Sequence, residues 1–213
     1  GVTLPEALGR VRGIVVLNRQ NYAQDLQLSS RGFGARSSFG VRGVRLVADG
    51  IPATMPDGQG QAATFALASA ERIEVLRGPF ASLYGNASGG VVQVFTADGP
   101  AEPSAGLTLL AGSHGARKAG LLAGGPAGEA RWLADLSRFR TDGYRDHSRV
   151  VRDAANVKVT MPAAGGRLTL VANALDQPDT QDPLGLTRAQ FEADPRQADA
   201  AATVFDTRKS VRQ

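Results

Sequence analysis

The chain has 213 residues and no cysteine, and 24 Lys and Arg against 20 Asp and Glu give it a formal net charge of +4. The lack of cysteine excludes disulfides and thiolate metal sites, and charge spread without a Lys/Arg run or an aromatic RNA-binding cluster argues against a nucleic-acid partner. No run of about 18 apolar residues occurs, which excludes a transmembrane helix, and the two histidines are not spaced with carboxylates as metal ligands.

The first residues predict a short helix followed by a strand. The i, i+3, i+4, i+7 spacing of an amphipathic helix is found at Leu4, Ala7, Leu8 and Val11. Thr3 is the expected N-cap, Pro5 lies in the first turn, and Gly13 ends the helix. Residues 14–17 then form a strand.

Short elements separated by glycine-containing turns follow up to residue 96. Alternating apolar residues predict strands at 26–31, 44–48, 73–76 and 91–95. Asp49-Gly50 is a turn signal, and residues 67–72 predict a short helix. We expect one compact α/β unit around a sheet that contains all four strands.

Three longer motifs in this region point to a protein family. They are Leu28-Ser-Ser-Arg-Gly-Phe-Gly34, Val44-Arg-Leu-Val-Ala-Asp-Gly-Ile-Pro52 and the stretch from Arg72 to Thr96, which contains R-I-E-V-L-R-G-P, L-Y-G-N and G-G-V-V. Glycines beside β-branched residues indicate close backbone approach and positive φ. In this order the motifs resemble the plug domain of TonB-dependent outer-membrane receptors. The resemblance implies a plug at 1–98 and a linker at 99–104.

The resemblance also implies a role for two arginines. Arg31 and Arg77 lie in the motifs Arg-Gly-Phe and Leu-Arg-Gly-Pro. Receptors of this family use arginines at these positions to pair with glutamates of the barrel wall and so lock the plug to the barrel. A guanidinium suits this role because it keeps its charge when buried and binds a carboxylate with two nitrogens. The alternative is that both are ordinary solvated arginines.

By the same resemblance, two plug loops, 18–24 and 54–61, face the ligand. Their amides and hydroxyls suit a polar, oxygen-rich ligand such as a metal chelate. The candidate ligand-binding residues are Asn18, Arg19, Asn21, Tyr22, Gln24, Met55, Asp57, Gln59 and Gln61. The alternative is that these are solvated loop residues positioned by the scaffold. We expect no resident metal and no cofactor.

Beyond the linker the sequence predicts strands of about ten residues. They are expected at 105–113, 117–124, 130–141, 150–161 and 167–176, with another at 206–213. In residues 156–161 the apolar side chains alternate with Asn156, Lys158 and Thr160. Alternation with apolar residues outward and polar residues inward is typical of a transmembrane β-barrel, although a soluble β-sandwich gives the same periodicity.

The connections favour the barrel. Residues 126–128 and 162–166 are tight turns, whereas 141–149 and 177–206 are long and polar, and barrels of the outer membrane have short turns on one side and long loops on the other. The resemblance implies a plugged barrel of 22 strands, of which residues 105–213 are the first. Because an open sheet edge is not tolerated in hydrocarbon, we expect the polypeptide to continue beyond Gln213. No signal peptide precedes Gly1, so we also expect it to begin upstream.

The expected fold is an α+β plug domain, with a mixed four-stranded sheet and short helices, followed by the first antiparallel strands of a transmembrane β-barrel. The resemblance implies a transporter in the outer membrane of a Gram-negative bacterium, surrounded by lipid. It would import a ferric siderophore or similar iron complex with energy from TonB, ExbB and ExbD. The alternatives are a receptor for cobalamin, haem or an oligosaccharide, or a soluble β-rich binding module.

The inventory of residues argues against an enzyme. Ser88 lacks the G-x-S-x-G frame of a nucleophile elbow. The glycines at 32 and 34 do not continue into a dinucleotide-binding pattern, and no phosphate-binding loop with Gly-Lys-Ser/Thr occurs.

Overall fold

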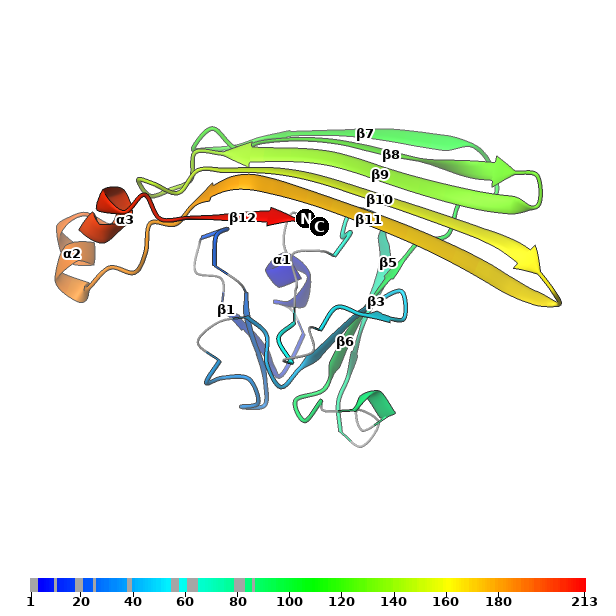
Figure 1. Ribbon diagram of the computed structural model, residues 1–213, viewed down its shortest axis with the longest axis horizontal. Helices are drawn as coiled ribbons and strands as arrows, with labels where there is room; N and C mark the ends of the chain where they lie inside the picture. Colours follow the sequence, from blue (N-terminus) through cyan, green and yellow to red (C-terminus); the bar gives the residue numbers. More distant parts are fainter. Residues whose placement is uncertain are drawn as a thin grey trace.

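The computed structural model describes residues 4–9, 11–17, 21–24, 26–37, 40–54, 58–60, 65–78, 83–85 and 87–213. The N-terminal part forms a compact unit that lies under the concave side of a long, curved, six-stranded sheet (Figure 1). In the described residues no helix combines the length and the apolar character needed to cross a membrane.

The chain starts with α1 (Leu4–Leu8) and a two-stranded antiparallel sheet of β1 (Ile14–Leu17) and β2 (Gln27–Ser30). The helix and the first strand are confirmed, but the helix ends at Leu8 rather than near Gly13. The Val11 N–H donates to the Leu8 carbonyl and starts a turn there. Leu4 and Leu8 are buried in the core, so their apolar contacts hold this short helix in place.

A four-stranded mixed sheet forms the second half of the unit. Its order is β4 (Ile51–Pro52), β3 (Arg45–Ala48), β6 (Val91–Thr96) and β5 (Ala70–Leu76). The β3–β6 pair is parallel and the other two pairs are antiparallel. The two central strands are buried, and Leu46 and Val92 are both fully inaccessible to solvent.

Two predictions for this unit are wrong. The strand expected at 26–31 is not part of the central sheet, because β2 pairs with β1 instead. The helix expected at 67–72 is absent, and β5 already begins at Ala70, which is paired with Thr96. Long-range pairing with β6 overrides the local helical preference of that short segment.

The C-terminal part is an antiparallel meander with its strands in sequence order, as predicted. The strands are β7 (Ser104–Ala111), β8 (Arg117–Ala127), β9 (Ala130–Thr141), β10 (Val150–Ala163), β11 (Gly166–Gln181) and β12 (Arg208–Arg212). The β8–β9 and β10–β11 turns lie at one end of the sheet, which we call the turn end. The connections 112–116, 142–149 and 182–207 lie at the other end, which we call the loop end (Figure 1). The predicted segregation of short and long connections is confirmed.

The longest connection differs from its prediction. β11 continues to Gln181, and the loop after it contains α2 (Arg188–Ala193) and α3 (Ala200–Val204). Thr187 and Gln190 form a capping box at the start of α2, and Asp199 caps α3.

The register of the meander gives its two faces opposite chemistry. Successive outward rows are Leu107-Leu121-Leu136-Ala155-Ala174, then Ala105-Ala123-Ala134-Val157-Ala172, then Gly125-Trp132-Val159-Leu170. The inward face of β10 carries Asn156, Lys158 and Thr160, which are 2%, 7% and 7% exposed. Polar residues are therefore covered on the concave side, while leucines are exposed on the convex side, as the alternation predicted.

Candidate functional site

The plug unit contacts the concave face of the sheet along a polar seam. We use the word seam for the contacts between residues 4–98 and the inward side chains of β8–β11, together with the loop after β11. Three groups of contacts form it: one around Lys158, one around Asn156, and one at the loop end around Asp182.

The contact around Lys158 contains a buried ion pair. Its ammonium donates to the Thr96 carbonyl at 2.7 Å and lies 3.4 Å from Asp49 Oδ1. The side chains of Lys158 and Asp49 are only 9% and 7% exposed. Because a lone buried charge is costly, this ion pair requires β10 and the β3–β4 turn to remain together.

Asp49 also organises the plug itself. Both of its carboxylate oxygens accept hydrogen bonds from Thr96, one from the backbone N–H at 2.9 Å and one from the hydroxyl at 2.6 Å. Asp49 has a φ of +48° in the β3–β4 turn, a conformation that aspartate tolerates better than most residues. The Asp-Gly turn therefore closes the end of β6 and presents a carboxylate to the wall.

Asp98 extends this cluster toward the solvent. One of its oxygens lies 3.1 Å from Lys158 Nζ, and the other lies 2.5 Å from Arg167 Nη2. Burial by itself would raise the pKa of the Asp98 carboxyl, but its contacts with Lys158 and Arg167 outweigh this effect and lower the pKa. Asp98 is 39% exposed and Arg167 is 56% exposed, so solvent screens this outer pair much more than the inner one.

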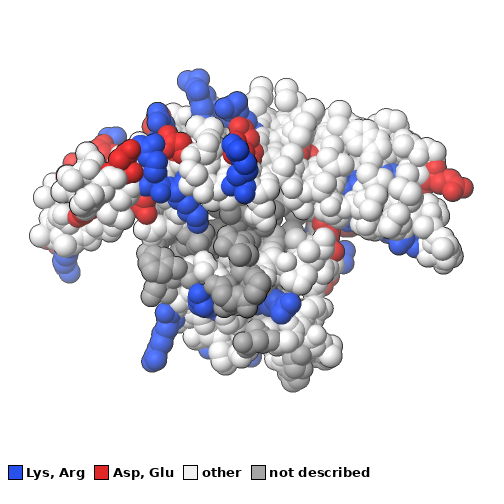
Figure 2. Space-filling model, viewed as in Figure 1, with Lys and Arg blue, Asp and Glu red and all other residues white. Residues whose placement is uncertain are grey.

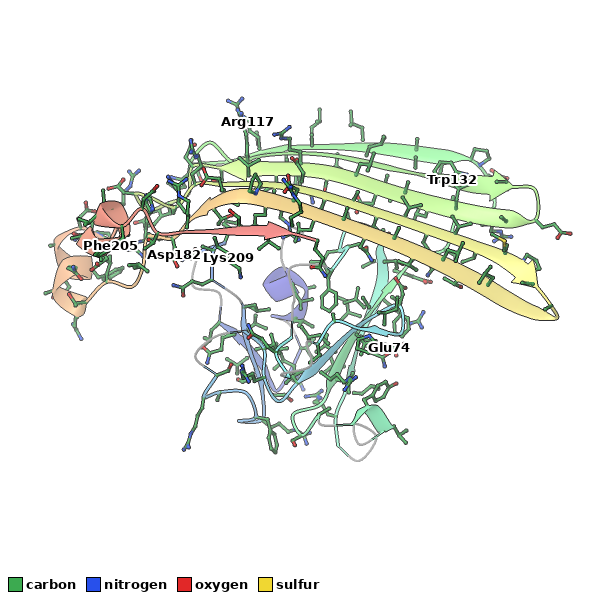
Figure 3. All side chains as sticks on the ribbon, viewed as in Figure 1. Glu74, Arg117, Trp132, Asp182, Phe205 and Lys209 are labelled. Carbon is green, nitrogen blue, oxygen red and sulfur yellow. The ribbon has the colours of Figure 1, made fainter. Side chains whose placement is uncertain are left out.

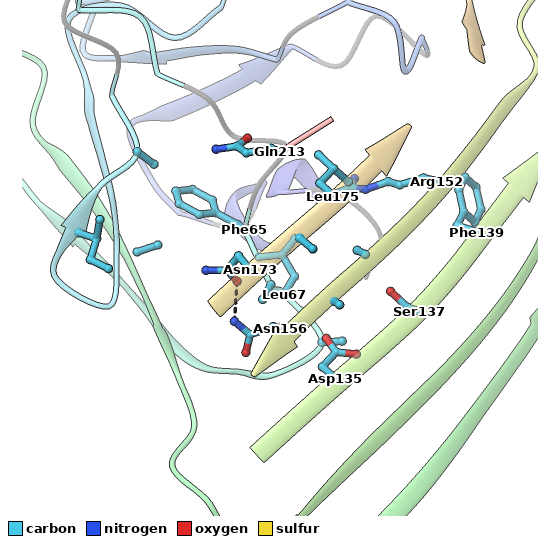
Figure 4. Close-up of a pocket in the computed structure, with 18 of the residues that line it drawn as sticks. Phe65, Leu67, Asp135, Ser137, Phe139, Arg152, Asn156, Asn173, Leu175 and Gln213 are labelled. Carbon is cyan, nitrogen blue, oxygen red and sulfur yellow. Dashed lines mark hydrogen bonds between the residues drawn. The ribbon is translucent and has the colours of Figure 1, made fainter. Parts of the chain in front are cut away.

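The middle contact borders a cavity of about 190 Å³ between the plug and the wall (Figure 4). Ser69 Oγ donates to Asn156 Oδ1 at 3.2 Å, and the Asn156 amide donates to Asn173 Oδ1 at 2.5 Å. Ala66–Ala68 and Phe65 line the plug side of the cavity.

Three charged residues of the wall also line the cavity: Lys118, Asp135 and Arg152. All three lie on the inward face, at positions in register with the plug-facing polar rows. Two of these three side chains are cations and one is a carboxylate, so charged groups of both signs line the wall side of the cavity.

The third contact lies at the loop end, where Asp182 joins the plug to the loop after β11 (Figure 3). The Asn21 amide donates to Asp182 Oδ1 at 2.6 Å, and the Gln24 amide donates to Oδ2 at 3.2 Å. The Gln177 amide donates to the Tyr22 carbonyl at 3.3 Å, and the Tyr22 ring packs 5.4 Å from the Phe139 ring, centroid to centroid. Plug residues 21–24 are thus fixed by four contacts with the side chains of Phe139, Gln177 and Asp182.

Arg145 holds the loop that carries Asp182. Its guanidinium donates to the carbonyls of Leu184, Pro183 and Gln197 at 2.6, 3.1 and 2.9 Å. Burial lowers the pKa of Arg145, and the nearby carboxylates of Asp182 and Asp199 oppose that shift. An arginine nevertheless stays charged in proteins, so Arg145 can keep its hydrogen bonds to these three carbonyls and hold the loop in place.

The structure brings the two predicted lock arginines to the same turn. The Arg77 guanidinium donates to the Arg12 carbonyl at 2.5 Å, and the Arg31 backbone N–H donates to the Gly13 carbonyl at 3.3 Å. Arg31 is exposed and Arg77 is half-buried. In the described residues neither guanidinium lies in an ion pair, so the lock with wall glutamates stays a prediction.

The glycine after the arginine motif has a clear structural role. Gly34 has a φ of +82°, and a Cβ there would lie 2.6 Å from the carbonyl oxygens of both Leu28 and Arg42. Only glycine fits this close backbone approach, which turns the chain after Arg31.

The predicted ligand residues fall into two groups. Asn21, Tyr22 and Gln24 lie together at the loop end, and Gln59 packs its side chain against the backbone of Gly40. Asn18, Arg19, Met55, Asp57 and Gln61 lie outside the described residues. No ligand contact of these residues is tested by the structure, so their binding role stays a prediction.

The sequence did not single out Asp182, Arg145, or the pairing of Lys158 with Asp49. The alternation in residues 156–161 did place Lys158 on the polar face, and Asp49-Gly50 was recognised as a turn. Their partnership spans 109 positions, and no local pattern could have revealed it. Among the described residues no group of three His, Asp or Glu could hold a metal ion.

Comparison with known proteins agrees with this architecture. The model of the TonB-dependent receptor plug domain matches residues 1–91. The vitamin B12 transporter BtuB of Photobacterium profundum is 34% identical over 132 residues, which cover 61% of this chain and 21% of the transporter.

Solved structures show the same fold. The siderophore receptor PirA of Acinetobacter baumannii has a TM-score of 0.68 at 19% identity, covering 95% of this chain and 32% of the receptor. The pyoverdine receptor FpvA of Pseudomonas aeruginosa PAO1 has a TM-score of 0.66 at 21% identity, covering 83% of this chain and 26% of the receptor.

The chain thus spans only 21% to 32% of the length of these relatives. The matched span contains a plug with a mixed sheet, followed by antiparallel strands like those that begin a receptor barrel. Residues 1–91 of the chain are therefore a TonB-dependent receptor plug domain.

Proposed function

We propose that this chain is the plug and first barrel strands of an outer-membrane transporter that imports an anionic metal chelate, such as a ferric siderophore. The observation that carries the proposal is the plug docked through buried polar contacts onto the concave face of a sheet whose convex face is apolar. A plug in this position blocks the lumen of a barrel. It must rearrange before a solute can pass.

The convex face supports a membrane location. Leu107 and Leu109 are 70% and 68% exposed, and Leu170 is 53% exposed. Exposed leucines on one face of a sheet in a soluble monomer would be an aggregation hazard, whereas a barrel wall needs them toward lipid. Because outer-membrane barrels have short turns on the periplasmic side and longer loops outside, we propose that the loop end is extracellular and the turn end is periplasmic.

The charge of the seam cavity supports an anionic ligand. Lys118 and Arg152 outnumber Asp135 on its wall. A cavity of about 190 Å³ is too small for a whole siderophore, and it suits one carboxylate or catecholate arm. We propose that the chelate first meets the plug loops 18–24 and 54–61 and then passes along this seam.

The match to the receptor plug domain motivates two further proposals, one for the energy source and one for the lock. We propose that TonB, with ExbB and ExbD, pulls on the plug, and that Arg31 and Arg77 pair with wall glutamates in the resting state. Arg77 is held by the Arg12 carbonyl, which fixes its guanidinium at the surface of the plug. Because both arginines lie at one turn, we propose that movement of this turn releases the plug from the barrel wall.

A cobalamin receptor is the second candidate, favoured by the 34% identity to a vitamin B12 transporter. Cobalamin lacks the strong negative charge of a ferric catecholate or citrate complex, so the two candidates differ in what the cavity should attract.

Uptake in whole cells tests the proposal. Cells that express the receptor would be given radioactive iron as ferric citrate or ferric enterobactin, and separately labelled cobalamin, with and without TonB. We expect TonB-dependent uptake of a ferric chelate. Uptake of cobalamin alone would replace the proposed ligand, and uptake that does not require TonB would overturn the proposed mechanism.

A further inference from the structure

At the loop end, two plug amides converge on one carboxylate of the loop after β11. Asn21 Nδ2 donates to Asp182 Oδ1 at 2.6 Å, and Gln24 Nε2 lies 3.4 Å from Oδ1 and 3.2 Å from Oδ2. The oxygen of the Asn21 amide accepts the Ala23 N–H at 2.8 Å, so a flip of this amide would break a second hydrogen bond. The plug therefore presents donors at this place, and the site takes an acceptor.

The carboxylate that fills this site belongs to a loop and can be reached from outside. Asp182, Asn21 and Gln24 are all half-buried, so solvent touches the contact. Asp182 lies toward the loop end on the concave side of the sheet (Figure 3). In the proposed orientation this is the side from which a ligand arrives.

Asp182 has partners in its own loop that do not depend on the plug. Its Oδ1 also accepts the Leu184 N–H at 3.0 Å. Its N–H donates to the Thr207 carbonyl at 2.9 Å, and its carbonyl accepts the Thr207 hydroxyl at 2.7 Å. Arg145 is close enough for its charge to interact with that of Asp182. If the carboxylate left the plug, it would keep a hydrogen bond and a counter-charge, so no isolated charge would result.

The surroundings at the loop end also suit a released carboxylate. Figure 2 shows acidic and basic side chains gathered together toward this end, whereas the sheet toward the turn end is mostly uncharged. The two plug amides, in contrast, would each give up a hydrogen bond to a charged group unless another acceptor replaced Asp182. A carboxylate of a ligand offers the same two oxygens and the same charge, so the exchange conserves the hydrogen bonds of the plug.

We propose that Asp182 is a built-in occupant of a carboxylate-binding site on the plug, and that a carboxylate of the transported chelate displaces it. The displacement frees the loop 182–207 from the plug when the ligand arrives. This inference rests on the proposed function and deepens it, because it commits the ligand to ferric chelates that carry a carboxylate. A catecholate chelate without a carboxylate leaves Asp182 in place.

The test measures binding of radioactive ferric citrate to the complete receptor in a neutral detergent. Variants on both sides of the contact are compared: D182A and D182N on the loop, and N21A/Q24A on the plug. The control is E192A, which removes the same charge from the same loop at a side chain that is 60% exposed and paired with Arg188. Ferric enterobactin, an anionic chelate without a carboxylate, is titrated in parallel.

Changes on the two sides should move the affinity for ferric citrate in opposite directions. D182A removes the competitor and should tighten binding by roughly tenfold or more. D182N should tighten it less, because a neutral oxygen is a weaker acceptor than a carboxylate. N21A/Q24A removes the site and should weaken binding by roughly tenfold or more.

The control and the second chelate separate carboxylate recognition from a general effect of charge. E192A should change the affinity for ferric citrate by less than about twofold, because an exposed charge is screened by salt. D182A should leave the affinity for ferric enterobactin unchanged. Equal tightening of both chelates by D182A would overturn the carboxylate site.

A contact that only supports the fold gives another pattern, since loosening it from either side shifts the affinity in the same direction. That result, or binding by D182A and D182N no tighter than by the parent, would overturn the inference. Absence of ferric citrate binding by the parent and by D182A would overturn it as well. TonB-dependent uptake of another ferric chelate would then still support the proposed function, whereas uptake of no ferric chelate would remove both.

Discussion

Replacing Lys158 with methionine should loosen the plug from the wall. Methionine keeps the length and apolar stem of lysine but removes the charge, the 2.7 Å bond to the Thr96 carbonyl and the ion pairs with Asp49 and Asp98. Removing one partner of a buried pair costs about 3–5 kcal/mol. Asp49 keeps both hydrogen bonds from Thr96, so we expect the lower end of that range, about 3 kcal/mol.

The matched control is Arg167→Met, which breaks the outer pair with Asp98 in the same cluster. These side chains are 56% and 39% exposed, and exposed pairs contribute about 0–1 kcal/mol. The two variants therefore remove the same charge from the same strand pair and differ in burial.

Hydrogen exchange of the complete receptor measures the difference. A loss of about 3 kcal/mol corresponds to roughly a hundredfold faster exchange through local opening. We expect this in the peptides that cover β3 and β6 of K158M, and a change of less than about fivefold in R167M. Equal acceleration in both variants, or almost none in K158M, would refute the claim that burial makes Lys158 the main contact of the seam.

Three further predictions address the rest of the seam. Asp182→Ala removes a charged acceptor from two plug amides. A hydrogen bond to a charged group contributes about 1.5–3 kcal/mol, so hydrogen exchange of residues 21–24 should rise at least tenfold. Unchanged hydrogen exchange would mean that the loop end is held by other contacts. The pKa of Asp98 is lowered on folding, so its stabilising effect is complete above the ordinary value of 3.8 and is lost as the pH falls below it; melting curves from pH 6 to pH 3 should show this loss in the parent and not in D98N, and parallel curves would contradict it. Replacing Arg31 and Arg77 together by alanine should weaken the plug–barrel lock by roughly 2–5 kcal/mol and increase the leak of a small antibiotic through the lumen; unchanged leak and uptake would make them ordinary surface arginines.

Local patterns were sufficient for the meander. Each strand pairs with its neighbour in sequence, so alternation and turn residues predict both the elements and the order. The polar face of residues 156–161 was recognised in the same way, because the side-chain period of a strand is two.

The plug was harder because its pairings are long-range. Whether residues 26–31 join the central sheet depends on β1, and whether residues 67–72 are helical depends on β6; neither partner can be read from the segment itself. The same limit applies to the seam. Asn21 and Gln24 were expected to present their amides to a ligand, and in the structure these amides donate to Asp182, about 160 positions away.

A disulfide across the seam tests most directly whether the plug is docked on this wall and must move for transport. These 213 residues contain no cysteine, so S69C/N156C introduces the only pair within them, at side chains that are hydrogen-bonded at 3.2 Å beside the seam cavity. S69C/L136C is the control, because Leu136 faces outward. We predict that oxidation joins the first pair and not the second, and that the joined receptor stops importing its chelate until a reductant is added. Failure of the first pair to join, or full uptake with the disulfide in place, would contradict the account.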